Sequence, residues 1–357
     1  MRKLSIFLLA ALSSAALTLA ACSSTPAAST AVPAPVSSTD LAKVTLRVGD
    51  QKGGSQALLT AAGLVNTPYH IQWSTFTSGP PLLEAANAGA IDVGGVGNTP
   101  PLFSAAANAK IAVVAGTQGP VTGDTVLVPA NSPIHTLADL RGKTIAVAKG
   151  SSAHGHLLLV LKKAGLTPSD VTLSYLQPAD AYAAFSQHQV DAWTIWDPYT
   201  SQALQQAGAR ILVDGTGTIN GAKPGTPAPT DGNALSNGYS FQVASRAALA
   251  DAGKNSAIQD YVVRLAKASV WAAGHLSAWA SVWAQQTGLA GTVARAAVVN
   301  TTRKPVPLTT ALVASEQQLA DNFVAAKVLP TKFTFADFVD HRYDSDITAY
   351  LKNEGNS

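Results

Sequence analysis

Charged residues are scarce in this sequence, and so are sulfur-containing ones. Lys, Arg, Asp and Glu make up 13% of the 357 residues, hydrophobic residues make up 47%, and there is one Cys and one Met. A chain of this length and hydrophobicity folds and has room for two domains, which excludes an intrinsically disordered protein. Since no basic cluster is present to contact a phosphate backbone, we expect no nucleic-acid partner. The formal net charge of +3 includes Arg2 and Lys3, so the chain beyond residue 21 is nearly neutral.

The single cysteine, Cys22, excludes a disulfide bond within the chain. It follows a charged "MRK" start and an apolar stretch over residues 4–20, and it closes the sequence "LAAC". This pattern is similar to a bacterial lipobox, whose cysteine becomes the acylated N-terminus of a lipoprotein. A transmembrane anchor would need roughly 20 apolar residues, and two serines interrupt this run. We therefore predict a lipoprotein signal peptide over residues 1–21 and an extracytoplasmic protein anchored to the cell membrane by lipid on Cys22, on the periplasmic side or in the cell-wall zone.

The rest of the chain divides into a tether and a folded body. Residues 22–43 are rich in Ser, Thr, Ala and Pro, which predicts a flexible tether. From Val44 onward, short β-rich runs alternate with Gly-rich loops and helical runs, a pattern typical of α/β proteins with parallel sheets. The predicted strands of a first set lie at residues 44–49, 69–76, 90–96 and 110–116, and those of a second set at residues 143–148, 171–176 and 190–196.

The order of these runs predicts two α/β lobes joined by a two-stranded hinge. The chain passes from one set to the other near residues 119–127 and returns near residues 239–243. The first lobe would comprise residues 44–124 and 240–357, including the C-terminal helices, and the second lobe residues 125–239. In open α/β sheets ligands bind outside the carboxyl ends of the strands, and pockets favour domain interfaces. We therefore expect a ligand site in a cleft between the lobes.

Five stretches resemble a known family. They are "LRVGDQKGGS", "LEAANAGAIDVGGVGNTPP", "NSPIHTLADLRGKTIAVAKGSSAHGHLLLVLKKAGL", "PADAYAAFSQHQVDAWTIWDPY" and "TTRKPVPL". They resemble the solute-binding lipoproteins of ABC importers for aliphatic sulfonates, over about residues 44–330, and taurine and nitrate binders less closely. The resemblance implies the bilobal periplasmic-binding-protein fold, a monomer without catalysis, cofactor or metal, and delivery of a small organic anion, an alkanesulfonate, to a membrane permease. The sequence departs from the family in a longer loop at residues 215–238 and in Asp50, where an uncharged and often aromatic residue is expected.

Other functions stay open at this stage. The ligand could be taurine, nitrate or another small anion, or the protein could be a lipid-anchored sensor of the same ligands. A cysteine desulfinase shares this fold, but it uses a nucleophilic thiol, and Cys22 is the only cysteine. Ser151 or Ser152 with His154 could suggest acyl transfer, but nothing in the sequence orients the histidine. Because His154 and His156 are two residues apart on a helix, they make a poor metal-binding pair.

The stretch "KGSSAH" is the strongest candidate for an anion site in the second lobe. It joins a predicted strand to a predicted helix, and a helix N-terminus offers unpaired N–H groups and about half a positive charge, which bind oxyanions. Gly150 would let the backbone approach the ligand, Ser151 and Ser152 would donate hydroxyl hydrogen bonds, and His154 would reach the cleft. The alternative interpretation is an ordinary helix cap, and one serine could cap while the other binds.

The remaining candidates surround the same predicted cleft. Trp196 lies at the carboxyl end of its strand and would cover the organic tail, whereas the alternative is a tryptophan of the core. Asp197 would first cap the following helix, and it would suit a ligand that carries an amino group. The first lobe would contribute Gln51, Gly54 and Ser55, and also Asn98 and Thr99, which precede a proline at a helix start.

Overall fold

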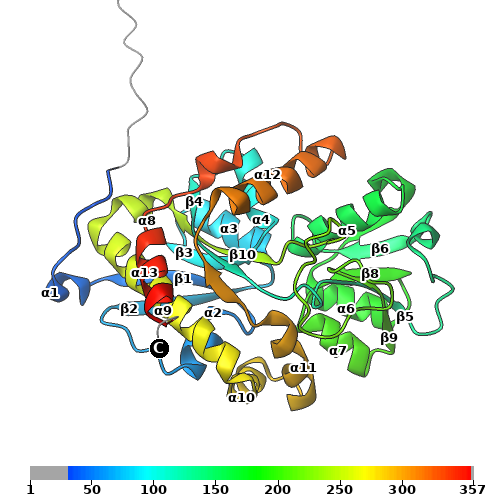
Figure 1. Cartoon of the computed structure of the whole chain (residues 1–357), viewed down its shortest axis with the longest axis horizontal. Coiled ribbons are helices and arrows are strands. Elements are labelled where there is room, and N and C mark those ends of the chain that lie inside the picture. The colour runs from blue at the N-terminus through cyan, green and yellow to red at the C-terminus, as the bar shows by residue number, and fades with distance from the viewer. Residues whose placement is uncertain (1–30, 355–357) are drawn as a thin grey trace, which may run out of the picture. The chain divides into compact units, whose positions relative to one another are not determined.

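The computed structural model describes residues 31–354. The predicted signal peptide and the lipidation site Cys22 lie outside these residues. The chain from Val32 onward forms one compact unit, and Figure 1 shows it as two α/β lobes. The last part of the predicted tether is ordered, because Ser38–Leu41 forms a short helix, α1, which Ser37 caps by accepting a hydrogen bond from the Asp40 amide. No described helix is long and apolar enough to cross a membrane.

The first lobe is built on a six-stranded sheet with the strand order β11-β4-β10-β3-β1-β2. Its strands are β1 (Thr45–Gln51), β2 (His70–Phe76), β3 (Val93–Gly97), β4 (Ile111–Gln118), β10 (Tyr239–Ser245) and β11 (Lys304–Val306). β1 is parallel to β2 and β3, but β10 is antiparallel to β3 and β4, and β11 is antiparallel to β4. The expectation of a parallel sheet is therefore wrong for these two strands, because each enters the sheet from the side of the second lobe.

The second lobe is built on a five-stranded sheet with the order β7-β6-β8-β5-β9. Its strands are β5 (Thr125–Pro129), β6 (Thr144–Val147), β7 (Thr172–Tyr175), β8 (Ala192–Ile195) and β9 (Ala209–Asp214). β6 is parallel to β7 and β8, and β5 is antiparallel to β8 and β9, so this sheet is also mixed. Two segments connect the sheets, one between β4 and β5 and one between β9 and β10. The loop of residues 215–238 belongs to the second connection and lies against the first, where the Val121 amide donates to the Thr226 carbonyl.

Helices cover both sheets (Figure 1). They are α2 (Ser55–Ala61), α3 (Gly79–Asn87), α4 (Pro100–Ala106), α5 (Ser152–Lys163), α6 (Pro178–Ser186), α7 (Tyr199–Gln206), α8 (Arg246–Ala250), α9 (Ala252–Gly274), α10 (Leu276–Thr287), α11 (Gly291–Thr301), α12 (Thr310–Ala325) and α13 (Asp344–Glu354), with 3-10 helices at Leu137–Leu140, Pro168–Asp170 and Phe335–Phe338. The two faces of the second sheet bury separate clusters, one around Leu157 and Leu161 and one around Phe185 and Trp193. This arrangement explains why β6 and β8, in the middle of the sheet, are mostly buried along their length.

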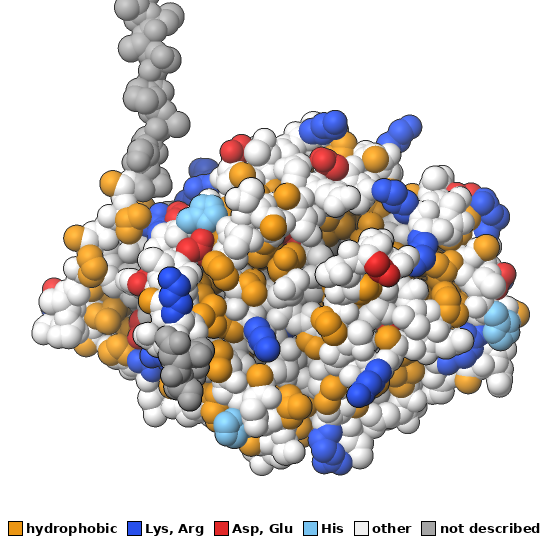
Figure 2. All heavy atoms as spheres, viewed as in Figure 1, with side chains coloured by type: hydrophobic (Ala, Val, Ile, Leu, Met, Phe, Trp, Pro, Cys, Tyr) orange, Lys and Arg blue, Asp and Glu red, His pale blue; other side chains and the backbone are white. Residues whose placement is uncertain are grey.

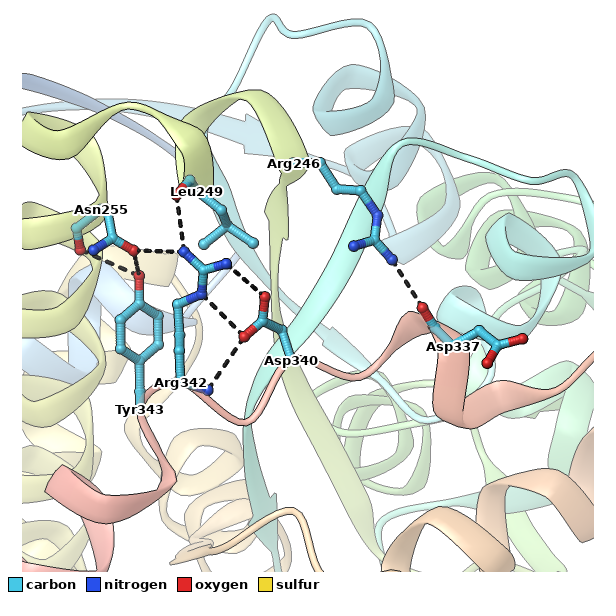
Figure 3. Close-up of polar contacts among 7 residues, drawn as sticks. All are labelled: Arg246, Leu249, Asn255, Asp337, Asp340, Arg342 and Tyr343. Carbon is cyan, nitrogen blue, oxygen red and sulfur yellow. Dashed lines mark hydrogen bonds and ion pairs between the residues drawn. The ribbon is translucent and has the colours of Figure 1, made fainter. Parts of the chain in front are cut away.

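The C-terminal segment is fixed to the first lobe by polar contacts around Arg342 (Figure 3). The Arg342 guanidinium pairs with Asp340 at 2.7 Å and donates to the Leu249 carbonyl and to Asn255 Oδ1. Tyr343 also donates to Asn255 Oδ1, at 2.8 Å. These bonds hold α13 against α9, so the last helix of the described chain is part of the first lobe.

Candidate functional site

A cavity of about 280 Å³ is lined by residues of both lobes. Its wall includes the carboxyl ends of β1, β3, β4 and β8, the starts of α2 and α5, and the end of α11. Of the residues predicted from the sequence, seven line it: Gln51, Gly54, Ser55, Ser151, Ser152, Trp196 and Asp197. Four others, Asn98, Thr99, Gly150 and His154, are not among its lining residues.

The two serines at the start of α5 have different roles. Ser151 is the N-cap, since its hydroxyl accepts from the His154 amide at 3.4 Å and donates to the Ala148 carbonyl at 2.7 Å. Its hydroxyl proton is therefore already engaged within the helix cap. Ser152 lies against the first lobe, where a Cβ placed on Gly97 would be 3.0 Å from the Ser152 Cβ. The Ser152 hydroxyl is thus the better placed of the two to donate to a ligand.

Gly150 and His154 do not line the cavity, and contacts within the chain engage the Gly150 amide and the His154 ring. The Gly150 amide donates to His154 Nδ1 at 3.1 Å, so this N–H is not free for a ligand. The positive φ of Gly150, 76°, fits a glycine, but its Cα faces Phe103 and Pro80 of the first lobe. The His154 ring packs among aromatic rings, with centroids at 6.0 Å from Phe103 and 5.5 Å from Phe323. Burial lowers the pKa of His154 to about 4, so the ring is neutral near pH 7.

The start of α2 is filled by the chain's own carboxylate. Asp50 Oδ1 accepts from the amides of Gln51 and Ser55, at 2.9 and 2.8 Å, and Oδ2 accepts from the Gln56 amide at 2.8 Å. In this structure these backbone amides are therefore used by Asp50, and the anion clamp predicted at this helix start stays a prediction. Burial raises the pKa of Asp50 to about 6, although the three hydrogen bonds favour the charged form. Gln51 lines the cavity with its amide group bonded to the Gly95 carbonyl.

Asn98 and Thr99 belong to a buried polar network beside the cavity. Asn98 Nδ2 donates to Asn237 Oδ1 at 2.9 Å, and Thr99 Oγ1 donates to Asn98 Oδ1. Asn237 in turn donates to Glu316 at 2.7 Å. Because the polar atoms of Asn98 and Thr99 are used in these bonds, the prediction that they bind the ligand is not supported by the geometry.

At the end of β8, Trp196 lines the cavity, while Trp193 is fully buried in the second lobe. Asp197 accepts from the Ser201 amide in the first turn of α7 at 2.8 Å, as expected of a capping residue. Its other oxygen accepts from Asn300 Nδ2 at 2.8 Å, which links α7 to α11. Burial raises the pKa of Asp197.

Arg303 is a cavity residue that the prediction of site residues missed. It follows α11, and its Nη1 donates to the Gly238 carbonyl at 2.5 Å. Within residues 31–354 it forms no ion pair. Burial lowers its pKa and the charge of Asp124 raises it, but an arginine stays protonated in proteins. A partly buried guanidinium without a carboxylate partner is suited to bind an oxyanion through two parallel hydrogen bonds. The only signal in the sequence was the stretch "TTRKPVPL", in which an arginine stands between a helical run and a proline.

The other charged residues of the cavity wall are Lys52, Asp50, Asp124 and Asp197. No group of three or more His, Cys, Asp or Glu residues that could hold a metal ion was found in the described part of the chain. The arrangement thus combines one partly buried arginine, hydroxyl donors and an aromatic side chain. Such an arrangement can bind a small anion.

Comparisons with known proteins agree with this geometry. Residues 81–220 match the family model described as NMT1/THI5 like. An aliphatic sulfonates-binding protein of Escherichia coli (strain K12) is 38% identical over 295 residues, which cover 80% of this chain and 86% of the relative. The alkanesulfonate-binding protein SsuA from Xanthomonas axonopodis pv. citri, solved bound to MOPS, is 35% identical, with a TM-score of 0.70 over 83% of this chain and 98% of that one.

The desulfurization enzyme DSZB is similar in fold alone, at 18% identity and a TM-score of 0.58 over 87% of this chain and all of that chain. The two-lobed periplasmic-binding-protein fold is confirmed by these structures. The match at 38% identity covers most of both chains, so it shows a relationship in sequence as well as in fold. The chain therefore belongs to the family of aliphatic sulfonate-binding proteins.

Proposed function

We propose that this protein is the extracytoplasmic solute-binding component of an ABC importer, which captures aliphatic sulfonates between its lobes and delivers them to a membrane permease. The observation that carries the proposal is Arg303, a cavity arginine without a carboxylate partner in the described chain. A sulfonate is ionised at every biological pH, so a permanent cation and hydroxyl donors suit it. The Ser152 hydroxyl, at the start of α5 in the second lobe, also lines the cavity and would donate to the same sulfonate.

The test is calorimetric titration of the purified protein with methanesulfonate, propanesulfonate, nitrate and sulfate. We expect the sulfonates to bind. Arg303→Gln should weaken their binding free energy by about 1.5–3 kcal/mol, the typical contribution of a hydrogen bond to a charged group. Arg295→Gln is the matched control, since Arg295 is exposed on α11 and does not line the cavity. Equal affinity of the wild type and Arg303→Gln for sulfonates would contradict the proposed site, and no binding of any sulfonate would contradict the function.

One observation favours a second candidate ligand, an amino-sulfonate such as taurine. Asp124 and Asp197 line the cavity, and neither forms an ion pair with another described residue. Buried carboxylates of this kind suit an ammonium group. Taurine and propanesulfonate have almost the same shape, so tighter binding of taurine would support this candidate and tighter binding of propanesulfonate would exclude it.

We also propose that the protein acts by binding alone and is anchored by lipid on Cys22. The desulfinase mechanism requires a thiol, and Cys22 is the only cysteine. The "LAAC" sequence after an apolar run supports lipidation. Mass spectrometry of the N-terminal peptide tests it: an acylated Cys22 is expected, and an unmodified N-terminus in the soluble fraction would contradict it.

A further inference from the structure

One helix of the second lobe, α5, packs along the first lobe outside the cavity. One side of α5 faces its own sheet, where Leu157 and Leu161 belong to the core of the second lobe. The opposite side carries residues spaced by three or four positions, so they follow one another along the helix. We call it the outer face of α5 and define it by His154, Gly155, Leu158 and Lys162. Leu158 is buried in a cluster that consists mainly of first-lobe side chains.

Helices α4 and α12 of the first lobe receive this face. The His154 ring lies between Phe103 of α4 and Phe323 of α12, with centroid distances of 6.0 and 5.5 Å. At the other end of α5, Lys162 donates to Asn322 of α12 at 2.8 Å. The contacts therefore run from the first turn of α5 to its last.

The closest approach between the two lobes on this face is at Gly155. A Cβ at this position would collide with Thr99 Oγ1 at the start of α4. Thr99 is fully buried, and its Oγ1 donates to Asn98 Oδ1 at 3.0 Å. Since a β-branched side chain has few allowed rotamers, Thr99 has little freedom to turn away. Gly155 is not among the residues with positive φ, so the neighbouring lobe, and not the helix itself, requires a glycine here.

The outer face of α5 touches the first lobe through side-chain contacts alone, because the two chain crossings lie elsewhere, between β4 and β5 and between β9 and β10. The same helix begins with Ser152, which lines the cavity. A Cβ on Gly97 of the first lobe would be 3.0 Å from the Ser152 Cβ. The seating of α5 on the first lobe therefore decides how close Ser152 comes to the opposite wall.

We propose that the outer face of α5 is the closing surface of this protein and that Gly155 is a positioning residue for ligand capture, a proposal that rests on the proposed function. When the ligand draws the lobes together, α5 seats on α4 and α12. The missing side chain at Gly155 lets the helix come close enough for Ser152 to reach the sulfonate. A contact outside the cavity thus contributes to the affinity, since it stabilises the bound arrangement of the lobes.

Gly155→Ala separates closure from folding. In the ligand-free protein we expect the melting temperature to stay the same or rise, because Ala is favoured over Gly within a helix. Calorimetric titration should show methanesulfonate bound about tenfold more weakly, because the added methyl group obstructs the seating of α5 on Thr99. Gly274→Ala is the matched control: Gly274 is exposed at the end of α9, with no atom near the position of its Cβ. Its affinity should stay within about twofold of the wild type.

A second pair of variants tests the contact itself. Thr99→Ala removes Oγ1 and leaves the Cβ, which is 3.6 Å from the position of the added methyl group, an ordinary contact distance. Affinities are compared between Thr99→Ala and the double variant Thr99→Ala/Gly155→Ala. We expect Gly155→Ala to weaken binding by less than about twofold in this background, since neighbouring residues are not additive when one removes the obstruction caused by the other.

Each outcome decides the proposal. A lower melting temperature of ligand-free Gly155→Ala, or a failure to fold, would show that α5 is seated without ligand, and the proposal is wrong. Methanesulfonate affinity equal to that of the wild type would show that the seating does not contribute to capture. An equal loss of affinity in both backgrounds would show that the effect does not pass through Thr99, which also overturns the proposal. These results leave the proposed function intact, whereas a wild type that binds no sulfonate overturns both.

Discussion

At the scale of single residues, Asp50 changes what the first lobe can offer an anion. Its carboxylate accepts three backbone hydrogen bonds at the start of α2, where a ligand anion would otherwise compete for the same amides. The other groups at this place are Lys52, which is exposed at the cavity wall, and the buried Tyr261 hydroxyl, whose pKa is raised by burial and by Asp50. Asp50 is therefore a negative charge next to a site for anions.

This charge predicts pH-dependent binding. Burial raises the pKa of Asp50 to about 6, so the carboxyl is neutral below that pH and charged above it, while the sulfonate keeps its charge throughout. Repulsion then weakens the binding of methanesulfonate as the pH rises from 5 to 7.5, by up to about tenfold at an effective dielectric constant of about 20. Asp50→Asn should reduce this dependence in calorimetric titrations at constant ionic strength, and what remains is expected from Asp197, a second cavity carboxyl whose pKa is raised by burial. His154 cannot account for it, because its pKa is lowered to about 4. The same slope in wild type and Asp50→Asn would contradict the prediction.

The residues that reach the cavity could be predicted where a local rule applies. Ser151, Ser152 and Trp196 follow from their positions at the end of a strand or the start of a helix. His154 could not be placed in this way, because its ring is held by Phe323, which lies far along the chain in α12. Arg303 was missed for the same reason, since only the strand pairing of β11 with β4 brings it to the cavity.

At the scale of elements, the sequence predicts most of the strands and misses three. β5, β9 and β11 were not predicted: β5 lies where the chain first crosses between the lobes, β9 has only three buried residues, and β11 has three residues in total. The direction of β10 could not be predicted either, because it depends on where the chain returns from the second lobe. Local patterns give the type of an element, whereas its direction and neighbours depend on contacts between distant segments.

Two helices with similar starts show the same limit. α2 and α5 both follow a strand and a turn with glycine and serine, and both were predicted to bind an anion. In α5 a serine hydroxyl caps the helix and the next serine lines the cavity, whereas in α2 the carboxylate of Asp50 occupies the start. The identity of the residue before the turn therefore decides what a helix start can bind. Only the structure shows that the Asp50 side chain bonds to the amides at the start of its own helix.

At the scale of the whole molecule, several contacts join the lobes away from the cavity. Gln177 Oε1, at the start of α6, accepts hydrogen bonds from the hydroxyls of Thr77 and Ser78, at 3.0 and 2.9 Å. Lys162 of α5 donates to Asn322 of α12 at 2.8 Å. The other Lys and Arg side chains visible in Figure 2 are spread over both lobes and do not gather in one patch on that face. The lobes are therefore connected by a few polar bonds, which can form and break if the hinge moves, and by the packing of the His154 ring against Phe103 and Phe323.

These contacts lead to a prediction about closure. If a ligand draws the lobes together, the bonds of Gln177 stabilise the bound form, and losing them must weaken binding even though Gln177 does not line the cavity. We expect Gln177→Ala to reduce methanesulfonate affinity by about fivefold to thirtyfold, as two hydrogen bonds contribute roughly 1–2 kcal/mol together. The cap of α6 is not affected, because Gln177 makes no side-chain capping bond.

The measurement combines calorimetry with small-angle X-ray scattering. In the wild type, saturating methanesulfonate should reduce the radius of gyration, and Gln177→Ala should need more ligand to reach the same value. Gln189→Ala serves as the control, because Gln189 is exposed in the second lobe and contacts Gln187 alone through its side chain among the described hydrogen bonds. A radius of gyration that stays constant while the ligand binds would show that the lobes do not close. Unchanged affinity in Gln177→Ala would contradict the prediction. It would show that the bonds of Gln177 are equally present with and without ligand, and that they do not contribute to closure of the lobes.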